Sequence, residues 1–240
     1  MQKLFVDFTP EKEFLLSGEQ ARHLTKSLRM KTGEMLTVTD GSGRDYGCQI
    51  TNITKDTVTL AVCYEQASES EPTCAVTIYQ GVPKGTKLEE ILQKCTELGA
   101  VRIVPTLTKR CISRPDDKSA KKKNERYQKI ALEAAQQSGR GIVPEIAPMK
   151  SLKEAIAEDT CDTKIVFYEG GGAPLGEIVK KDTKSVSVYI GPEGGFDADE
   201  VALLTAHGAA QATLGKRILR TQTAPVAALS VIMYITGNLA

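Results

Sequence analysis

The sequence has no stretch of about 20 consecutive apolar residues, which is the length that a membrane-spanning helix needs. Its first residues, MQKLFVDFTPEKEF, also lack the apolar core of a secretory signal peptide. We therefore expect a cytoplasmic protein with no membrane association.

Metal and thiol chemistry have little support in the sequence. The six cysteines are scattered, and no two of them form a C-x-x-C pair. The two histidines, His23 and His207, are far apart and belong to no recognisable metal or catalytic pattern. Because zinc ligands usually come in closely spaced pairs, we expect no metal site, and we expect the cysteines to be small buried side chains in a reducing cytoplasm.

The chain has almost no excess of charge. Its net charge is +1, so any affinity for nucleic acid must come from local patches. One patch lies between Lys109 and Arg126, where eight Lys and Arg residues oppose three acidic residues. Another consists of Arg22, Lys26 and Arg29, whose spacing places them on one face of a helix predicted over residues 17–30. Either patch can attract phosphates or can be an ordinary solvated surface.

The pattern of apolar residues divides the chain in two. Three short runs, Met35–Thr39, Tyr46–Ile53 and Thr57–Tyr64, predict a small β-barrel or meander in the first part. The polar segment 67–73 is a candidate linker. After it, strand-like and helix-like runs alternate, which predicts an α/β fold with a mostly parallel sheet that helices cover on both faces.

Two loops that follow strand-like runs are candidate ligand sites. One is IGPEGGF at Ile190–Phe196, and the other is LGKRILRTQTA at Leu214–Ala224. Ligands of open parallel sheets bind beyond the carboxyl ends of the strands, and glycine lets the backbone approach them closely. The second loop places the apolar pair Ile218 and Leu219 among three cations, which suits a loop that folds over a ligand and points arginines at an anion.

Simpler roles remain open for several of these residues. Glu193 can serve chemistry or only a turn, and both loops can be plain strand-to-helix connections. For the acidic residues after the first loop, beginning at Asp197, we expect helix capping. Thr221 and Thr223 can cap the last helix. The strand-like run before the EGGG loop ends in Phe167, Tyr168 and Glu169, where an aromatic side chain can flank a bound cofactor, although we favour a core position.

The two loops together resemble the motifs GPEGG and LGxRILRTxTA of the SPOUT methyltransferases. The resemblance is strongest to the RsmE-like branch of these enzymes. Residues 81–100, GVPKGTKLEEILQKCTELGA, are similar to a further motif of that branch, written PKGDKLEWIIQKxTELG. Residues 23–34 and 109–140 resemble two more of its regions. The resemblance therefore covers nearly the whole chain.

The resemblance implies a specific fold and activity. Residues 1–70 would form a PUA-like β-barrel that binds RNA, and residues 74–240 a SPOUT methyltransferase domain with a deep trefoil knot. Members are homodimers that use S-adenosyl-L-methionine to methylate N3 of a specific uridine in bacterial 16S ribosomal RNA. The expected partners are thus ribosomal RNA or the small ribosomal subunit, a second copy of the chain, and no metal.

The resemblance also implies roles for individual residues. The cofactor would lie against Gly191, Gly195, Leu214, Gly215, Ile218, Leu219 and Thr221. For catalysis, the chemistry of uracil N3 suggests that Arg220 and Arg217 stabilise negative charge on the base or bind a phosphate, and Glu193 is the candidate base. The expected RNA contacts are Arg22, Lys26, Arg29, Arg110, Arg114, Lys121, Lys122 and Arg140.

One departure keeps alternatives open. Gln222 stands where the family usually has glutamate, so a charge is lost there. This change favours a non-catalytic RNA-binding assembly factor on the same scaffold. A nucleotide-binding small-molecule enzyme of the Rossmann type is a second alternative, although the first loop of the α/β part, PKGTK, does not fit its glycine pattern.

Overall fold

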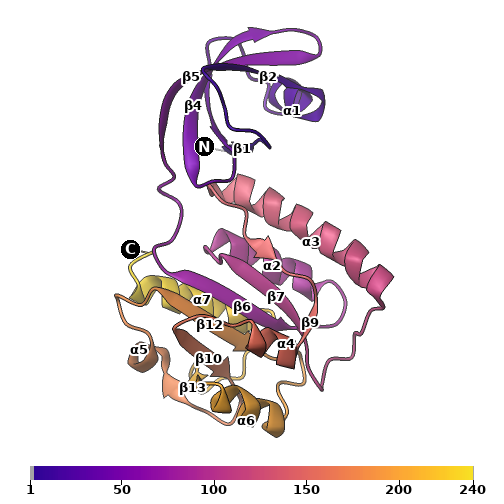
Figure 1. Cartoon of the computed structure of the whole chain (residues 1–240), viewed down its shortest axis with the longest axis vertical. Coiled ribbons are helices and arrows are strands. Elements are labelled where there is room, and N and C mark those ends of the chain that lie inside the picture. Colours follow the sequence, from indigo (N-terminus) through magenta and orange to yellow (C-terminus); the bar gives the residue numbers. More distant parts are fainter. Residues whose placement is uncertain (1–2, 240) are drawn as a thin grey trace. The chain divides into compact units, whose positions relative to one another are not determined.

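The computed structural model describes residues 3–239, without the side chain of Asp117; residues 1, 2 and 240, at the ends of the two predicted domains, lie outside the described part. The chain splits into two compact units (Figure 1). The first is Met1–Glu71 with Ala135–Val143, and the second is Pro72–Ala134 with Pro144–Ala240. Residues 135–143, which we predicted in the second domain, therefore belong to the first unit.

The first unit contains a five-stranded sheet of order β1-β3-β4-β5-β2, in which only the β1–β3 pair is parallel. Its strands are β1 (Lys3–Phe5), β2 (Glu13–Ser17), β3 (Met35–Thr39), β4 (Arg44–Ile53) and β5 (Thr57–Ala67). The three predicted strands are confirmed. Within residues 3–239 the outer strands β1 and β2 do not pair with each other, so strand pairing does not close the barrel that we predicted.

The predicted helix over residues 17–30 is shorter than expected. The helix α1 (Gly18–Arg22) continues into one π-helical segment, η1 (His23–Ser27), and Arg29 then adopts a positive φ of 55°. A π turn is wider than an α turn, so the spacing of an ideal helix no longer applies. Arg22, Lys26 and Arg29 are all exposed, but they do not share the single helix face that we predicted.

The second unit is built on an eight-stranded sheet of order β11-β13-β10-β12-β6-β7-β8, with β9 beside β7. Its strand pairs are parallel, which confirms the predicted mostly parallel α/β fold. The strands are β6 (Ala75–Gly81), β7 (Arg102–Leu107), β8 (Glu145–Ile146), β9 (Lys150–Ser151), β10 (Thr163–Phe167), β11 (Ala173–Pro174), β12 (Ser185–Ile190) and β13 (Ala209–Thr213).

Helices pack against this sheet. They are α2 (Lys87–Glu97), α3 (Asp117–Ser138, whose last turn belongs to the first unit), α4 (Leu152–Ala157), α5 (Leu175–Ile178), α6 (Ala198–Ala206) and α7 (Thr223–Ile235). Tyr79 and Tyr189 stack with centroids 4.5 Å apart and share a buried cluster with side chains of α4 and α6. The helix α7 packs against α2, β6 and β12. Within residues 3–239, no helix has the length and apolar character to cross a membrane.

Candidate active site

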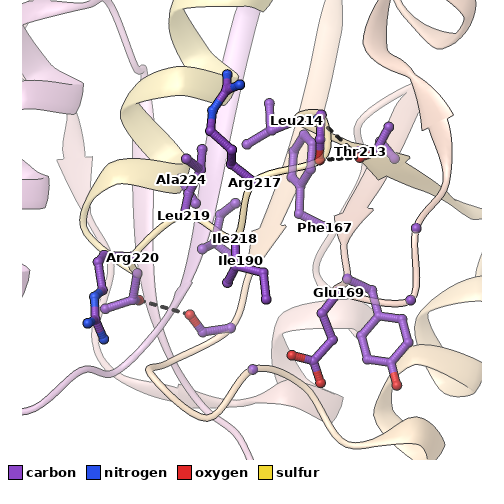
Figure 2. A pocket seen from close by; sticks show the side chains of 18 of the residues that line it. Phe167, Glu169, Ile190, Thr213, Leu214, Arg217, Ile218, Leu219, Arg220 and Ala224 are labelled. Carbon is purple, nitrogen blue, oxygen red and sulfur yellow. Dashed lines mark hydrogen bonds between the residues drawn. The ribbon is translucent and has the colours of Figure 1, made fainter.

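A cavity of about 810 Å³ lies at the carboxyl ends of β13, β10 and β12, which are neighbours in the sheet. The loops that follow these three strands form its walls, so segments far apart in the sequence meet there (Figure 2). This is the position at which open α/β sheets bind ligands. The lining includes all residues predicted for cofactor binding or catalysis: Gly191, Glu193, Gly195, Leu214, Gly215, Arg217, Ile218, Leu219, Arg220 and Thr221.

Two glycines have a geometric reason to be there. A Cβ atom on Gly191 would lie 2.8 Å from the carbonyl carbon of Gly195, because the loop folds back on itself. Gly215 has a φ of 96°, which side chains rarely tolerate. The cavity wall is therefore largely bare backbone, which offers N–H and C=O groups to a ligand.

Thr221 joins two of the cavity loops. Its hydroxyl donates a hydrogen bond of 2.9 Å to the carbonyl oxygen of Gly191 and accepts one of 3.1 Å from Nε2 of Gln80. The predicted capping of α7 by Thr221 and Thr223 is wrong, because the N-cap residue is Gln222 and no side chain caps the helix. Thr221 lines the cavity and links two of its loops, and its predicted contact with the cofactor stays a prediction.

The remaining walls are mainly apolar. Ile190 and Leu214 line the cavity beside Leu219, and Ile218 is 87% exposed at the loop that closes it (Figure 2). An apolar wall with a few polar groups is typical of sites for small molecules that carry an aromatic ring.

Glu193 is anchored by the start of α2. Its carboxylate accepts hydrogen bonds from the backbone N–H of Lys84 at 3.1 Å and from Nζ of Lys87 at 2.6 Å. Burial acts to raise the pKa of the Glu193 carboxyl, but the hydrogen bonds from Lys87 and the backbone outweigh it, and the pKa lies below its usual value. A carboxylate with a lowered pKa is a weak base, so this geometry favours an anchoring role over the predicted role as proton acceptor.

Arg217 and Arg220 point in opposite directions from their loop (Figure 2). Both are exposed, and neither guanidinium forms an ion pair or hydrogen bond within residues 3–239. Two free cations next to a cavity can bind a phosphate or stabilise a developing negative charge. Both of the roles considered for them, charge stabilisation and phosphate binding, therefore stay predictions.

The loop after β10 also lines the cavity, and the sequence predicted no role for its Glu169. Tyr168 and Glu169 both line the cavity together with Gly170 and Gly171. Glu169 is exposed and has no ion-pair partner within the described part of the chain. Of the two positions considered for Phe167 and Tyr168, the core and the side of the cofactor, the cavity lining favours the second, although Tyr168 also packs against a core cluster.

The acidic residues after the first loop act as expected. The Asp197 side chain accepts from the Asp199 backbone, and Asp197 and Glu200 form a capping box at the start of α6. Among residues 3–239, no group of three or more His, Cys, Asp or Glu side chains is placed to hold a metal ion.

Of the residues predicted to contact RNA in the second unit, two arginines bond the backbone of the protein and two lysines are exposed. Arg110 donates a hydrogen bond of 2.7 Å to the carbonyl oxygen of Gly194, so it supports the cavity loop. Arg114 donates one of 2.7 Å to the carbonyl oxygen of Thr108. Lys121 and Lys122 are exposed on α3, free to meet phosphates.

Arg140 corrects the prediction. Its side chain is only 3% exposed and its Nη2 lies 2.6 Å from Oε2 of Glu71. The same carboxylate accepts hydrogen bonds from the backbone N–H groups of Gly141 and Ile142. Arg140 is therefore an interior residue of the first unit and cannot reach a phosphate at the surface.

Comparison with known proteins places the chain in a family. Residues 69–233 match the RNA methyltransferase domain, and residues 16–63 match the RNA methyltransferase PUA domain. A Bacillus subtilis protein named ribosomal RNA small subunit methyltransferase E is 37% identical over 98% of this chain and 97% of its own length. A protein of that name from Synechocystis is 34% identical over 90% of this chain and 71% of its own length.

Solved structures agree with these sequence matches. The crystal structure of a Neisseria gonorrhoeae ribosomal RNA small subunit methyltransferase E, bound to S-adenosyl methionine, superposes with a TM-score of 0.88 at 29% identity, covering 98% of this chain and 97% of the other. A hypothetical protein with 36% identity has a TM-score of 0.90, each chain being covered in full. The chain therefore belongs to the RNA methyltransferases that carry a PUA domain, and within them to the ribosomal RNA small subunit methyltransferase E family.

Proposed function

We propose that this protein methylates N3 of a specific uridine in bacterial 16S ribosomal RNA and takes the methyl group from S-adenosyl-L-methionine. The observation that carries the proposal is the meeting of both glycine motifs of the family at one cavity. The relatives named ribosomal RNA small subunit methyltransferase E and the related structure with bound S-adenosyl methionine support it. Activity on ribosomal RNA would take place in the cytoplasm.

The cavity suits S-adenosyl-L-methionine in size and chemistry. When bound, this molecule supplies a methyl group on a positively charged sulfonium. A volume of about 810 Å³ falls within the range of small-molecule sites. Leu214 and Leu219 provide apolar surface for an adenine ring, and the loop glycines expose backbone groups for its polar edge. Glu169 adds a free carboxylate for the positive charge of the molecule.

The chain contributes to the chemistry mainly by position and charge. The N3–H group of uracil is a weak acid, and its loss leaves negative charge spread over two carbonyl oxygens. We assign Arg220 to stabilise this charge, because its guanidinium is free and its backbone carbonyl is fixed by the first turn of α7 through Thr223 and Ala224. Arg217, which points the other way, would bind a phosphate.

RNA binding would involve both units. Arg22, Lys26 and Arg29 in the first unit, and Lys121 and Lys122 in the second, are exposed cations suited to the phosphate backbone. The first unit matches a PUA domain of RNA methyltransferases, which supports a role in holding RNA.

Two features of the family complete the proposal: a trefoil knot and a homodimer. The resemblance to the SPOUT methyltransferases supports the knot; the loop 214–222 leads into α7 and is joined to the loop after β12 by the hydrogen bond from Thr221 to Gly191. On α7, Val231 is 40% exposed and Tyr234 is 70% exposed, and such apolar surface suits a contact with a second copy. Light scattering would give the mass of the particle, and Tyr234→Arg should reduce it to that of one chain.

The non-catalytic alternative finds no support in the geometry. Gln222, which suggested it, is the N-cap residue of α7 and does not line the cavity. We therefore keep the catalytic function as the conclusion.

Two measurements test this function. Isothermal titration calorimetry of the purified chain with S-adenosyl-L-methionine should show saturable binding. Small-subunit ribosomal RNA or subunits from cells without the gene should then gain one methyl group, which mass spectrometry of nucleosides should identify as 3-methyluridine. Absence of binding, or a methyl group on another atom, would contradict the proposal.

A further inference from the structure

Gln80 lies outside the cavity lining but contacts two of the three loops that form it, the one after β12 and the one before α7. It is the penultimate residue of β6, and its side chain is fully buried. Its Nε2 atom donates hydrogen bonds to the Gly81 carbonyl oxygen at 3.0 Å and to the Thr221 hydroxyl at 3.1 Å, and it reaches the Gly191 carbonyl oxygen at 3.5 Å. One amide nitrogen thus joins the end of β6, the loop after β12 and the loop before α7.

The surroundings fix which end of the Gln80 amide faces the loops. If the amide were turned over, Oε1 would face two carbonyl oxygens, those of Gly81 and Gly191, which would repel it. In the observed orientation Oε1 is buried and has no hydrogen-bond partner within residues 3–239. Leaving a buried acceptor unpaired is costly, so the contacts of Nε2 must outweigh that cost.

The backbone cannot take over this role by moving closer. A Cβ atom on Gly81 would lie 2.5 Å from the Pro192 ring, which shows that β6 and the loop after β12 are already in tight contact. The single O–H donor of Thr221 is already used, because it donates to Gly191, and the hydroxyl accepts from Gln80. Removing the amide would therefore leave the Thr221 hydroxyl without its donor and the two loops with one link fewer.

We propose that Gln80 is a positioning residue that keeps the two loops in the arrangement that binds the methyl donor. The inference rests on the proposed function, since the donor is its ligand. Without the amide, a smaller fraction of molecules would hold the loops in the binding arrangement. The apparent affinity would fall in proportion to that fraction. The loss of one buried hydrogen-bonding group corresponds to a change of about ten-fold in Kd.

Two variants of Gln80 test this role by calorimetry with S-adenosyl-L-methionine. Gln80→Met keeps the size of the side chain but loses its hydrogen bonds. It should raise Kd about ten-fold, the change expected for the loss of one buried hydrogen-bonding group. Gln80→Glu should bind weakly at neutral pH, because a carboxylate would face the two carbonyl oxygens. Burial raises the pKa of such a carboxyl, so mild acid should restore its O–H donor and part of the affinity. Wild type should show no such recovery.

Control variants separate positioning from general loss of stability. The control is Thr106→Val. The Thr106 hydroxyl is buried in the sheet that contains Gln80 and donates a hydrogen bond to the Val104 carbonyl, outside the cavity, so its removal should leave Kd unchanged. Thr221→Val should reproduce the effect of Gln80→Met, and it serves as the second variant if Gln80→Met does not fold. The effects of the two single variants should not add in the double variant, because both remove the hydrogen bond between Gln80 and Thr221, although Thr221→Val also removes the one to Gly191.

A measurement without ligand keeps this inference separate from the proposed function. In the ligand-free protein, hydrogen exchange of the backbone amides in residues 191–196 and 220–224 should be faster in Gln80→Met than in wild type, while the rest of the sheet is unchanged. Equal exchange there, or equal Kd for Gln80→Met and wild type, would overturn the role of Gln80. If wild type itself binds no donor, the proposed function fails, and hydrogen exchange still decides whether Gln80 holds the loops.

Discussion

Nζ of Lys87, the first residue of α2, lies 2.6 Å from Oε1 of Glu193 in the loop after β12. The same Glu193 carboxylate also accepts a hydrogen bond from the backbone N–H of Lys84. It connects the PKGTK segment, similar to one family motif, to the GPEGG segment, similar to another. The two motifs contact each other, and their contact holds one wall of the cavity.

This pair predicts how Glu193→Gln will behave. We expect KM for the methyl donor to rise several-fold while kcat changes little, because the loop is held less firmly but no proton acceptor is lost. Steady-state kinetics with labelled donor measures both constants. A kcat that falls about 100-fold or more at unchanged KM would instead identify Glu193 as the general base.

The stability of the pair should depend on pH. Because the folded-state pKa of Glu193 lies below its usual value of 4.5, the ion pair stabilises the fold fully above that pH, and its contribution is lost as the pH falls through the folded-state pKa. Thermal unfolding of wild type and Glu193→Gln should therefore differ at neutral pH and converge in acid. Glu169→Gln, which removes an unpaired carboxylate from the same cavity, is the matched control and should show no such convergence.

The two arginines of the 214–222 loop should have separable effects. Arg220→Ala should lower kcat by roughly 100-fold, the usual cost of removing one group that stabilises an oxyanion. Arg217→Ala should mainly raise KM for RNA, because we assign it to a phosphate. Arg220→Lys should recover part of the rate, since a positive charge is retained. Wild-type turnover by Arg220→Ala would remove Arg220 from the mechanism.

Much of the fold and the cavity was predictable because short sequence signals specify them. Glycines at the ends of strand-like runs gave Gly191 and Gly215, and the alternation of runs gave the parallel sheet. Gln80 and Glu169 carry no such signal, since a glutamine inside an apolar strand and a glutamate in a glycine-rich loop are ordinary. Their roles depend on strands that are neighbours in the sheet but distant in the chain.

The wrong predictions have the same origin. Arg140 lies between two glycines at a helix end, which is typical of an exposed residue, and only the fold brings it to Glu71, 69 residues away. The early end of the helix at residues 17–30 is a local departure into a π turn, which apolar spacing does not distinguish from an α turn. Sequence patterns therefore could not predict pairs of side chains that only the tertiary fold brings together.

The exposed lysines of α3 should contribute to RNA affinity in a salt-dependent way. Lys121→Gln with Lys122→Gln should weaken RNA binding, and the slope of log K against log salt should become less steep by about 0.7 to 0.9 for each phosphate that the variant no longer neutralises. The kcat at saturating RNA should stay unchanged. Lys153→Gln with Lys181→Gln removes the same charge from exposed positions of the second unit outside the patch, and it should leave the slope as in wild type.

Arg140, by contrast, should affect stability and leave RNA binding unchanged. Arg140→Ala leaves the carboxylate of Glu71 in a largely buried position without its partner, and breaking such a pair costs about 3–5 kcal/mol of unfolding free energy. Urea unfolding measures this change. Arg44→Ala, which breaks the exposed pair with Glu65 in the same unit, should change stability little. At a temperature where Arg140→Ala is still folded, its RNA affinity and the slope of log K against log salt should equal those of wild type. A slope that is shallower by the amount expected for one phosphate would show that Arg140 contacts RNA.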